Sequence, residues 1–260
     1  MAHITVIANQ KGGVGKSTTA SVMADGLMRK NKRVLLIDMD AQGNTSLSFG
    51  AKLNLPSVYD VLTKQCDAFA AVQPGINRPD VIASNKKLAR LDIELVSIGK
   101  EFHLKEQLEP LSFKYDFIII DTPPALGVLT VNALTAANTV LMPAQADIYS
   151  IQGIGQLAET IKAIRTYTNP GLTLAGILLT RHNARNVISR DMADSAQVIA
   201  TQVGTFLYDT VIREAVAIRE SQAIQQSIFD YAPKSNAAID YMTFIDEYNS
   251  KVMPQKSQEK

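Results

Sequence analysis

The residues best suited to chemistry lie in the segment VIANQKGGVGKSTTA, at positions 6–20. Its glycines allow backbone N–H groups to turn inward and approach phosphates closely, and the helix expected to follow adds the positive end of its dipole. In such a loop the ammonium of Lys16 contacts the β- and γ-phosphates, and the hydroxyl of Ser17 ligates Mg²⁺. The segment therefore predicts a phosphate-binding loop whose nucleotide contacts come from Gly12, Gly13, Gly15, Lys16, Ser17 and Thr18.

Two features separate this loop from the common phosphate-loop pattern. Gln10 stands where that pattern has its first glycine, so the strict pattern is broken. Lys11 adds a second lysine to the loop, although one lysine is enough to hold a phosphate. The second lysine therefore needs a reason of its own.

Acidic side chains follow two further apolar segments. Asp38 and Asp40 lie at the end of LLIDMD, and Asp121 ends FIIID. A strand of apolar residues that delivers a carboxylate keeps that group dry and rigid, as a ligand of the magnesium shell requires. We therefore expect Asp38, Asp40 and Asp121, together with Ser17, to hold the magnesium shell and to orient the attacking water.

Short apolar segments alternate with longer helical segments along the chain. This alternation predicts a doubly wound α/β fold, with a mostly parallel sheet, helices on both faces and ligands at the carboxyl ends of the strands. The expected strands are residues 4–8, 33–38, 117–121, 139–143, 174–180 and 205–212, and the expected helices include residues 17–31, 151–167 and 187–203.

Residues 51–90 are the least regular part of the chain, with scattered Pro, Gly and Asn. They could form a helical excursion or a flexible insertion. No repeat and no linker divides the sequence, so we expect a single ATPase domain over residues 1–250. Residues 251–260 are polar, and we expect this tail to be frayed.

Composition limits the class of protein. The formal net charge of +1 gives no global basic field, so any binding of nucleic acid must come from a local patch. The single cysteine, Cys66, excludes an internal disulfide framework and fits a reducing compartment. We find no signal-peptide pattern and no apolar segment long enough to span a bilayer, and we expect a cytoplasmic location.

The segment KGGVGKS resembles the deviant Walker A box of the ParA/MinD superfamily, in which the early lysine marks the class. In that family the signature lysine, here Lys11, reaches across a dimer and contacts the phosphates bound by the other subunit. Two lysines in one loop repel each other, and a bound polyphosphate relieves that repulsion. A charge supplied in trans would also couple nucleotide chemistry to association.

Two further motifs extend the resemblance. DMDAQGN is similar to the family's switch I segment DxDPQGN, whose second acid, here Asp40, is tied to hydrolysis; Ala41 replaces the usual proline, which leaves the stiffness of the loop open. DTPP resembles switch II, whose prolines stiffen a loop that senses the γ-phosphate. In relatives an asparagine after a later strand touches the adenine, which makes Asn183 a candidate. The resemblance covers residues 4–248 and is weakest over residues 51–90.

The sequence excludes several branches of this superfamily. A nitrogenase-type iron protein needs more cluster ligands than Cys66, and a tyrosine autokinase would carry a tyrosine-rich tail. A MinD-like membrane ATPase needs a C-terminal amphipathic helix, and MPQKSQEK has no such face. The resemblance therefore favours partition ATPases similar to Soj and ParA, which bind DNA without sequence preference.

Arginines in the second half of the chain are the candidates for DNA contact. They could gather in one basic patch, or any one of them could lie on a solvated helix face paired with a neighbouring acid. The candidates are Arg181, Arg185, Arg190, Arg213 and Arg219.

The expected function is an ATPase that partitions a plasmid, a chromosome or a mobile element. It would dimerise with ATP and Mg²⁺, bind non-specific DNA on the nucleoid, and release that DNA after slow hydrolysis. The resemblance also implies a ParB-like centromere-binding protein as the activating partner. Two alternatives stay open: a MinD-like positioning ATPase that acts on a membrane or a protein complex, and an ATP-dependent ligase related to the dethiobiotin synthetases.

Overall fold

A seven-stranded sheet organises the chain in the computed structural model, which describes residues 1–182 and 187–253, with the backbone alone for residues 148, 151 and 187–193. The strands lie in the order β3-β4-β2-β5-β1-β6-β7, and all neighbours are parallel except the edge pair β3 and β4. This arrangement confirms the predicted α/β fold. The strands are β1 (His3–Ile7), β2 (Val34–Asp38), β3 (Val72–Gln73), β4 (Asp80–Ile82), β5 (Phe117–Asp121), β6 (Thr139–Gln145) and β7 (Thr173–Thr180).

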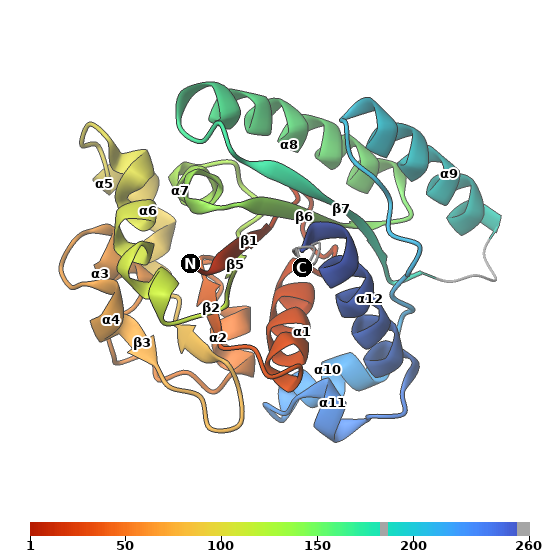
Figure 1. The fold of residues 1–260 in the computed structure, drawn as a ribbon, viewed down its shortest axis with the longest axis horizontal. Helices are drawn as coiled ribbons and strands as arrows, with labels where there is room; N and C mark the ends of the chain where they lie inside the picture. Colours follow the sequence, from red (N-terminus) through yellow and green to blue (C-terminus); the bar gives the residue numbers. More distant parts are fainter. Residues whose placement is uncertain (183–186, 254–260) are drawn as a thin grey trace, which may run out of the picture.

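Helices cover both faces of the sheet (Figure 1). On one face α1 and α12 lie side by side above α10 and α11, and on the other face lie α7, α8 and α9, while α3 to α6 gather at the β3–β4 edge. The helices are α1 (Lys16–Arg29), α2 (Asn44–Ser48), α3 (Val58–Leu62), α4 (Ala68–Ala71), α5 (Leu91–Glu94), α6 (His103–Leu108), α7 (Val128–Ala136), α8 (Ile148–Tyr167), α9 (Val187–Gln202), α10 (Val216–Ala223), α11 (Ile228–Tyr231) and α12 (Asn236–Val252), with short 3₁₀ turns at Lys86–Arg90, Lys100–Phe102 and Pro110–Phe113.

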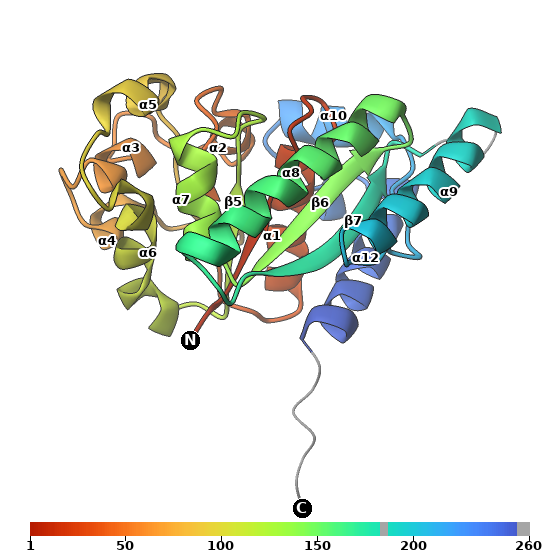
Figure 2. The same cartoon turned by 90° about the horizontal axis from the view of Figure 1, so that it is seen from above.

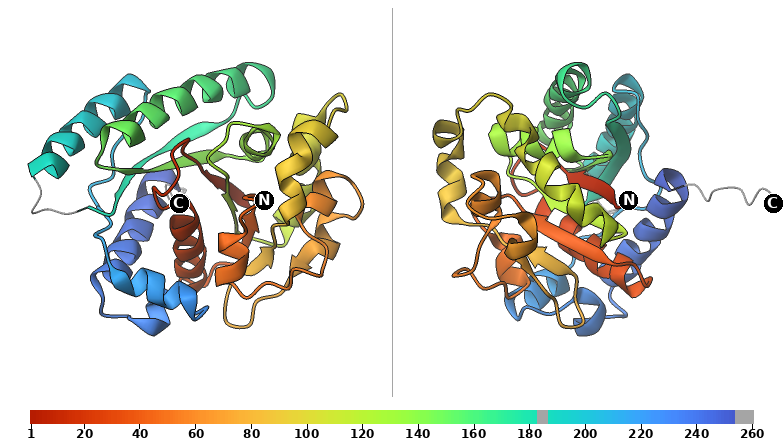
Figure 3. Two further views of the ribbon diagram at one scale, coloured as in Figure 1. Left: turned by 180° about the vertical axis from the view of Figure 1, so that it is seen from behind. Right: turned by 60° about the vertical axis from the view of Figure 1, so that its left-hand side comes forward.

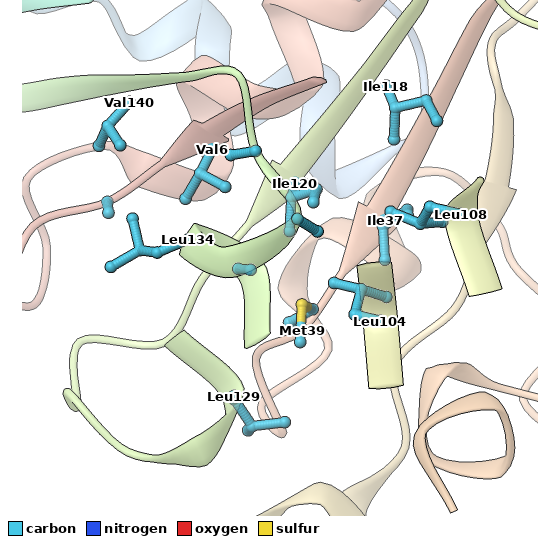
Figure 4. Packing of buried hydrophobic residues seen from close by; sticks show 14 of the residues in the cluster. Val6, Ile37, Met39, Leu104, Leu108, Ile118, Ile120, Leu129, Leu134 and Val140 are labelled. Carbon is cyan, nitrogen blue, oxygen red and sulfur yellow. The ribbon is translucent and has the colours of Figure 1, made fainter. Parts of the chain in front are cut away.

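Residues of the central strands alternate between two apolar clusters. In β5, Ile118 and Ile120 pack with residues of α6 and α7 (Figure 4) and also of α8, whereas Phe117 and Ile119 pack toward α1 and α12. A parallel strand covered on both faces needs an apolar side chain at every position. This is why the sequence FIII is uninterrupted.

The register of the central strands brings their last residues to one level. Ile7 at the end of β1 pairs with Asp121 at the end of β5, and Asp121 pairs with Asp38 at the end of β2. The loops that follow these strands therefore meet at one edge of the sheet, next to α2 and α10 (Figure 2). In open parallel sheets ligands bind at this edge.

The prediction of a strand at residues 205–212 is wrong, because the structure has no strand there. Among the described residues the segment makes one isolated bridge to the edge strand β7, from Leu207 to Ile177, and a second isolated bridge, from Arg213 to His182, lies just past the ends of both. Between these bridges the backbone N–H groups of residues 209 and 210 donate to the carboxylate of Glu247 on α12, at 2.9 and 3.0 Å. A side chain from another element therefore takes the place of a strand ladder.

Residues 51–90 are not a purely helical excursion. They contain α3, α4 and the strands β3 and β4, which extend the sheet at one edge. Of the polar tail expected at residues 251–260, residues 251 and 252 end α12, and residues 254–260 lie outside the described residues.

The last described helix returns to the first strand of the chain. On α12, which lies beside α1 when seen from behind (Figure 3), the hydroxyl of Tyr248 bonds to Thr5 of β1 at 2.6 Å. Within residues 1–182 and 187–253, no helix has the length and apolar character needed to cross a membrane.

Candidate nucleotide site

The loop between β1 and α1 has the backbone geometry of an anion cradle. Gly13 and Gly15 have φ angles of +78° and +85°, values that glycine adopts without strain. Neighbouring strands fix the loop from behind: Gln145 Nε2 donates to the Gly13 carbonyl and Thr180 Oγ1 donates to the Val14 carbonyl, each at 2.8 Å. The first turn of α1 carries no acidic residue, so its N–H groups can receive an anion.

Lys16, the first residue of α1, is buried and makes a hydrogen bond within the loop. The residue is 6% exposed, and its Nζ donates to the backbone carbonyl of Lys11 at 2.9 Å. Burial lowers the pKa of this lysine, while the carboxylates of Asp121 and Asp40 raise it. A buried ammonium bonded to a neutral carbonyl is suited to bind an incoming phosphate.

Two carboxylates lie buried beside this lysine. One Asp38 oxygen accepts bonds from the backbone N–H and the hydroxyl of Ser46, both at 2.7 Å. One Asp121 oxygen accepts from the hydroxyl of Thr45 at 2.7 Å, and its Oδ1 has no hydrogen-bond partner among the described residues. Burial raises the pKa of both carboxyl groups, and Asp38 raises that of Asp121 further.

This pair of carboxylates fits a hard divalent cation. The buried, unpartnered Oδ1 of Asp121 is the kind of oxygen that Mg²⁺ prefers, directly or through water. The hydroxyls of Thr45 and Ser17 oppose the rise in the pKa of Asp121, which places Ser17 near that carboxylate. Ser17, Asp38 and Asp121 are thus brought together, as the sequence predicts for a magnesium shell.

The loop after β2, where Ala41 replaces the usual proline, is held by apolar packing and by hydrogen bonds. Ala41 packs against the apolar core, and the backbone N–H of Gly43 donates to the Asp40 carbonyl at 2.9 Å. The hydroxyl of Ser84 also donates to that carbonyl. Asp40 itself faces the pocket, where its Oδ1 accepts from the backbone N–H of Gln42 at 3.0 Å.

Lys11 does not face the pocket. Its Nζ forms an ion pair with Asp147 Oδ2 at 2.6 Å and lies 5.9 Å from the centre of the Tyr149 ring. Asp147 also caps α8, where it accepts from the backbone and the hydroxyl of Ser150. Sequence reasoning missed Asp147 as the partner of Lys11, although D-x-x-S before a long helical segment is a recognisable N-cap.

These groups surround a pocket of about 750 Å³. A smaller cavity of about 110 Å³ shares Gly15 and Thr18 with it and has the apolar walls Ile212, Ile218 and Tyr241. The larger pocket is lined by the loop and helix residues Gly12, Gly13, Gly15, Lys16, Ser17, Thr18 and Ser21, by Asp40, Gln42, Asn44, Thr45, Leu47, Ser48 and Pro124, and by Arg181, Arg219, Gln222 and Ala223.

The three described candidate DNA arginines, Arg181, Arg213 and Arg219, all line the smaller cavity. Arg181 and Arg219 line both cavities, and Arg213 forms a bidentate pair with Asp240 at 2.6 and 2.9 Å. The remaining DNA candidates, Arg185 and the side chain of Arg190, lie outside the described residues, and so does Asn183, the candidate contact of the adenine. The sequence did not indicate that Arg181 and Arg219 line the pocket, because that depends on how α10 packs.

A family model and two characterised relatives match this chain over most of its length. The AAA_31 family model, described as an AAA domain, matches residues 2–174. The sporulation initiation inhibitor protein Soj of Bacillus subtilis is 37% identical over 251 residues, which cover 95% of this chain and 98% of Soj. The chromosome partitioning protein ParA of Caulobacter vibrioides is 35% identical over 255 residues, which cover 96% of this chain and 94% of that protein.

Solved structures share the fold over nearly the whole chain. Cobyrinic acid a,c-diamide synthase from Mycobacterium smegmatis, with bound ADP and magnesium, superposes with a TM-score of 0.82 at 34% identity, covering 95% of this chain and 93% of that one. A putative plasmid partition protein from Borrelia burgdorferi B31, bound to AMPPNP, gives a TM-score of 0.79 at 27% identity, covering 97% of this chain and all of that one.

Proposed function

The chain belongs to the ParA/Soj-like family of the ParA/MinD superfamily, and from this membership we propose that it is a DNA-partitioning ATPase. In this proposal residues 1–250 act as one domain that binds ATP with Mg²⁺, dimerises and then binds non-specific DNA. Hydrolysis, slow without a partner, releases the DNA. The single structural observation that supports binding of ATP with Mg²⁺ is the buried Asp38–Asp121 pair beside Lys16 and the glycine loop, in which one Asp121 oxygen has no partner among the described residues.

Each residue of the pocket has a role in this proposal. The backbone N–H groups of Gly12, Gly13 and Gly15 bind phosphate oxygens, and Lys16 contacts the β- and γ-phosphates. Asp40, which faces the pocket from the loop after β2, orients the attacking water. Thr18, which lines both cavities, contacts the α-phosphate.

In this proposal the Mg²⁺ ion and the adenine base bind at two different parts of the site. Ser17, Asp38 and Asp121 would hold Mg²⁺, which supplies charge neutralisation at the β- and γ-phosphates. The smaller cavity suits the base of the nucleotide, because its apolar walls can cover the faces of an adenine.

Dimerisation gives Lys11 its function in this proposal. A lysine that contacts the phosphates of the other subunit must first leave Asp147, so the observed ion pair belongs to the monomer. Its charge then completes the site only when two subunits meet, which couples ATP binding to association.

Binding to DNA would require basic groups that the nucleotide leaves free. Arg213 is half exposed in spite of its pair with Asp240; it lines the smaller cavity but, unlike Arg181 and Arg219, not the large pocket. Arg185 and Arg190 remain candidates from the sequence. We further propose a location on the nucleoid and an activating partner of the ParB type, by likeness to the partition proteins of the family.

A titration on random-sequence duplex DNA tests the proposal. It uses ATP, ADP and no nucleotide, with Asp40→Ala to prevent turnover and Lys16→Ala as the control that should not bind nucleotide. We expect DNA binding only with ATP, and its strength should fall steeply as salt rises because phosphate contacts release counterions. Equal binding in all three states, or no binding in any, contradicts the DNA-partitioning function; retention on liposomes with ATP would then favour a MinD-like positioning ATPase.

One observation supports a second candidate function. The likeness to the cobyrinic acid a,c-diamide synthase extends over 95% of this chain, so an ATP-dependent ligase that activates a carboxylate is a reasonable alternative. Such an enzyme turns over ATP only with a small carboxylic acid present and does not respond to DNA. ATPase assays with DNA alone and with small carboxylic acids alone separate the two.

A further inference from the structure

A single arginine outside the nucleotide pocket joins two of the helices that wall it. The pocket is bounded on one side by α2, through Ser48, and on another by α10, through Gln222 and Ala223. Arg78 lies in the loop between β3 and β4, which is not part of the pocket wall. Its Nη1 donates to the carbonyl of Ser48 at 2.9 Å and to the carbonyl of Gln225 at 3.0 Å.

These two bonds fix the spacing between the helix ends. Carbonyls in the last turn of a helix lack intrahelical partners, and Ser48 ends α2 while Gln225 follows the cap of α10. One charged donor satisfies both carbonyls. The ends also meet directly, since a Cβ on Gly50 would lie 3.1 Å from Gln225 Oε1. The guanidinium carbon lies 3.9 Å from the centre of the Phe49 ring, so stacking holds it in place.

The loop that carries Arg78 is built as a tight turn. Asn77 has a φ of +55°, and a Cβ on Gly75 would lie 2.3 Å from the Arg78 carbonyl. The backbone N–H of Gly75 donates to Asp80 Oδ1 at 3.0 Å at the base of the hairpin. The position of the guanidinium is therefore set by a constrained backbone.

Arg78 also lines a small cavity of about 20 Å³. Three buried atoms that face no hydrogen-bond partner among the described residues belong to its lining residues: Nε of Arg78, Oγ of Ser21 and Oδ1 of Asp25. A polar cavity of this size has room for one water, and three partners are what a buried water needs. Ser21 and Asp25 lie on α1, the helix that begins with Lys16.

We propose that Arg78 is a positioning residue that sets the width of the nucleotide pocket, by tying α2 to α10 directly and to α1 through one internal water. It acts through the helix ends and contacts no nucleotide. Because α2 follows the loop that carries Asp40, the same tie also restrains the helix into which that loop leads. The inference rests on the proposed function in one respect, that the pocket takes ATP.

The test compares two substitutions in the full chain. Arg78→Met keeps an unbranched stem and removes the donors, whereas Arg78→Lys keeps one charged donor without the planar stacking. The probe is N-methylanthraniloyl-ATP with Mg²⁺, titrated by fluorescence, with urea unfolding measured on the same samples. We expect the dissociation constant to rise about tenfold in Arg78→Met and about threefold in Arg78→Lys, as expected for loss of charged hydrogen bonds to both helix ends.

Two controls separate the possible results. Leu108→Ala lowers stability by leaving a cavity at α6, away from the pocket, and should bind the probe like the parent. Lys16→Ala should lose the probe. Binding by Lys16→Ala at the parent level overturns the nucleotide site and the role of Arg78 with it. If Lys16→Ala fails while Arg78→Met binds within twofold of the parent, or if Leu108→Ala binds as weakly as Arg78→Met, the role of Arg78 alone is overturned.

Discussion

At the scale of single residues, Lys11 is held by a contact that its proposed role requires it to leave. Its Nζ lies 2.6 Å from Asp147, and the two side chains are 29% and 30% exposed. Ion pairs with this much access to solvent stabilise a protein by about 0.2–1 kcal/mol. The pair can therefore keep Lys11 away from its own pocket and still release it when a second subunit offers bound phosphate.

Asp147→Asn tests this reading of the pair. Asparagine can still cap α8, but it removes the charge that holds Lys11. We expect dimers to form at an ATP concentration roughly threefold lower than in the parent. The parent must break the Lys11–Asp147 ion pair, which costs less than about 1 kcal/mol, whereas the variant has no such pair to break. Light scattering across an ATP titration, with Asp40→Ala in both proteins to prevent turnover, measures the change.

A matched substitution on the same helix controls this experiment. Glu159→Gln breaks the exposed 2.6 Å pair with Lys162 on α8 and should leave dimerisation unchanged. Weaker dimerisation in Asp147→Asn would mean that Asp147 aims Lys11 at the other subunit. Such a result would contradict its role as a restraint on the monomer.

Many residues of the pocket could be predicted from the sequence, because the arrangement of a parallel sheet determines where the strands end. Residues that end neighbouring parallel strands must meet at one edge, so Asp38, Asp121 and the glycine loop had to lie together. The contact between Lys11 and Asp147 could not be placed in this way. It joins residues 136 positions apart through side chains alone, and no periodic pattern records such a pair.

At the scale of elements, apolar runs predicted the central strands but failed where another element competes for the backbone. Residues 205–212 have a strand-like composition, yet Glu247 of α12 binds the N–H groups that a ladder would use. The hairpin of β3 and β4 is too short to leave a periodic signal, because its strands have two and three residues. Both features depend on long-range packing, which local patterns do not contain.

The contact between α1 and α12 depends on a glycine inside a helix. A Cβ on Gly26 would lie 2.2 Å from Ile245 Cδ1 and 3.3 Å from the Phe229 ring. Gly26→Ala gains about 1 kcal/mol of helix propensity but forces this interface apart at a cost of about 1–3 kcal/mol. We expect a net loss of up to about 2 kcal/mol in the free energy of unfolding, measured in urea.

A second substitution shows whether the loss of stability in Gly26→Ala comes from the contact with Ile245. Ile245→Val removes the methyl group that the new Cβ would meet, so the Gly26→Ala, Ile245→Val double variant should be more stable than Gly26→Ala alone. Additive effects of the two substitutions would place the cost of Gly26→Ala elsewhere than at this interface.

At the scale of the whole molecule, one buried network ties the two ends of the described chain to the sheet. Thr139 of β6 bonds to His3 Nε2 at 3.0 Å and to Thr5 at 3.1 Å, and Thr5 bonds to Tyr248 of α12. Burial lowers the pKa of His3 to about 4 from its ordinary value of 6.5. The folded chain therefore favours the neutral imidazole.

The sign of the resulting pH dependence follows from that shift. Between pH 6.5 and pH 4 the unfolded chain binds a proton at His3 that the folded chain does not, so the contribution of His3 is complete above pH 6.5 and is lost as the pH falls toward 4. At about 1.4 kcal/mol per pKa unit, the free energy of unfolding should fall by about 2 kcal/mol between pH 7.5 and pH 5 through this residue. Urea unfolding at the two pH values measures the fall.

The substitution His3→Gln isolates this part of the pH dependence from the buried carboxyl groups. Glutamine can still bond to Thr139 and does not titrate, whereas burial raises the pKa of Asp38 and Asp121 and so makes their contribution change with pH in the opposite direction. The difference between parent and variant cancels the carboxyl part, so the variant should lose about 2 kcal/mol less than the parent between pH 7.5 and pH 5. Parallel pH profiles would show that His3 titrates normally in the folded chain, and that the network at the base of the sheet tolerates its charge.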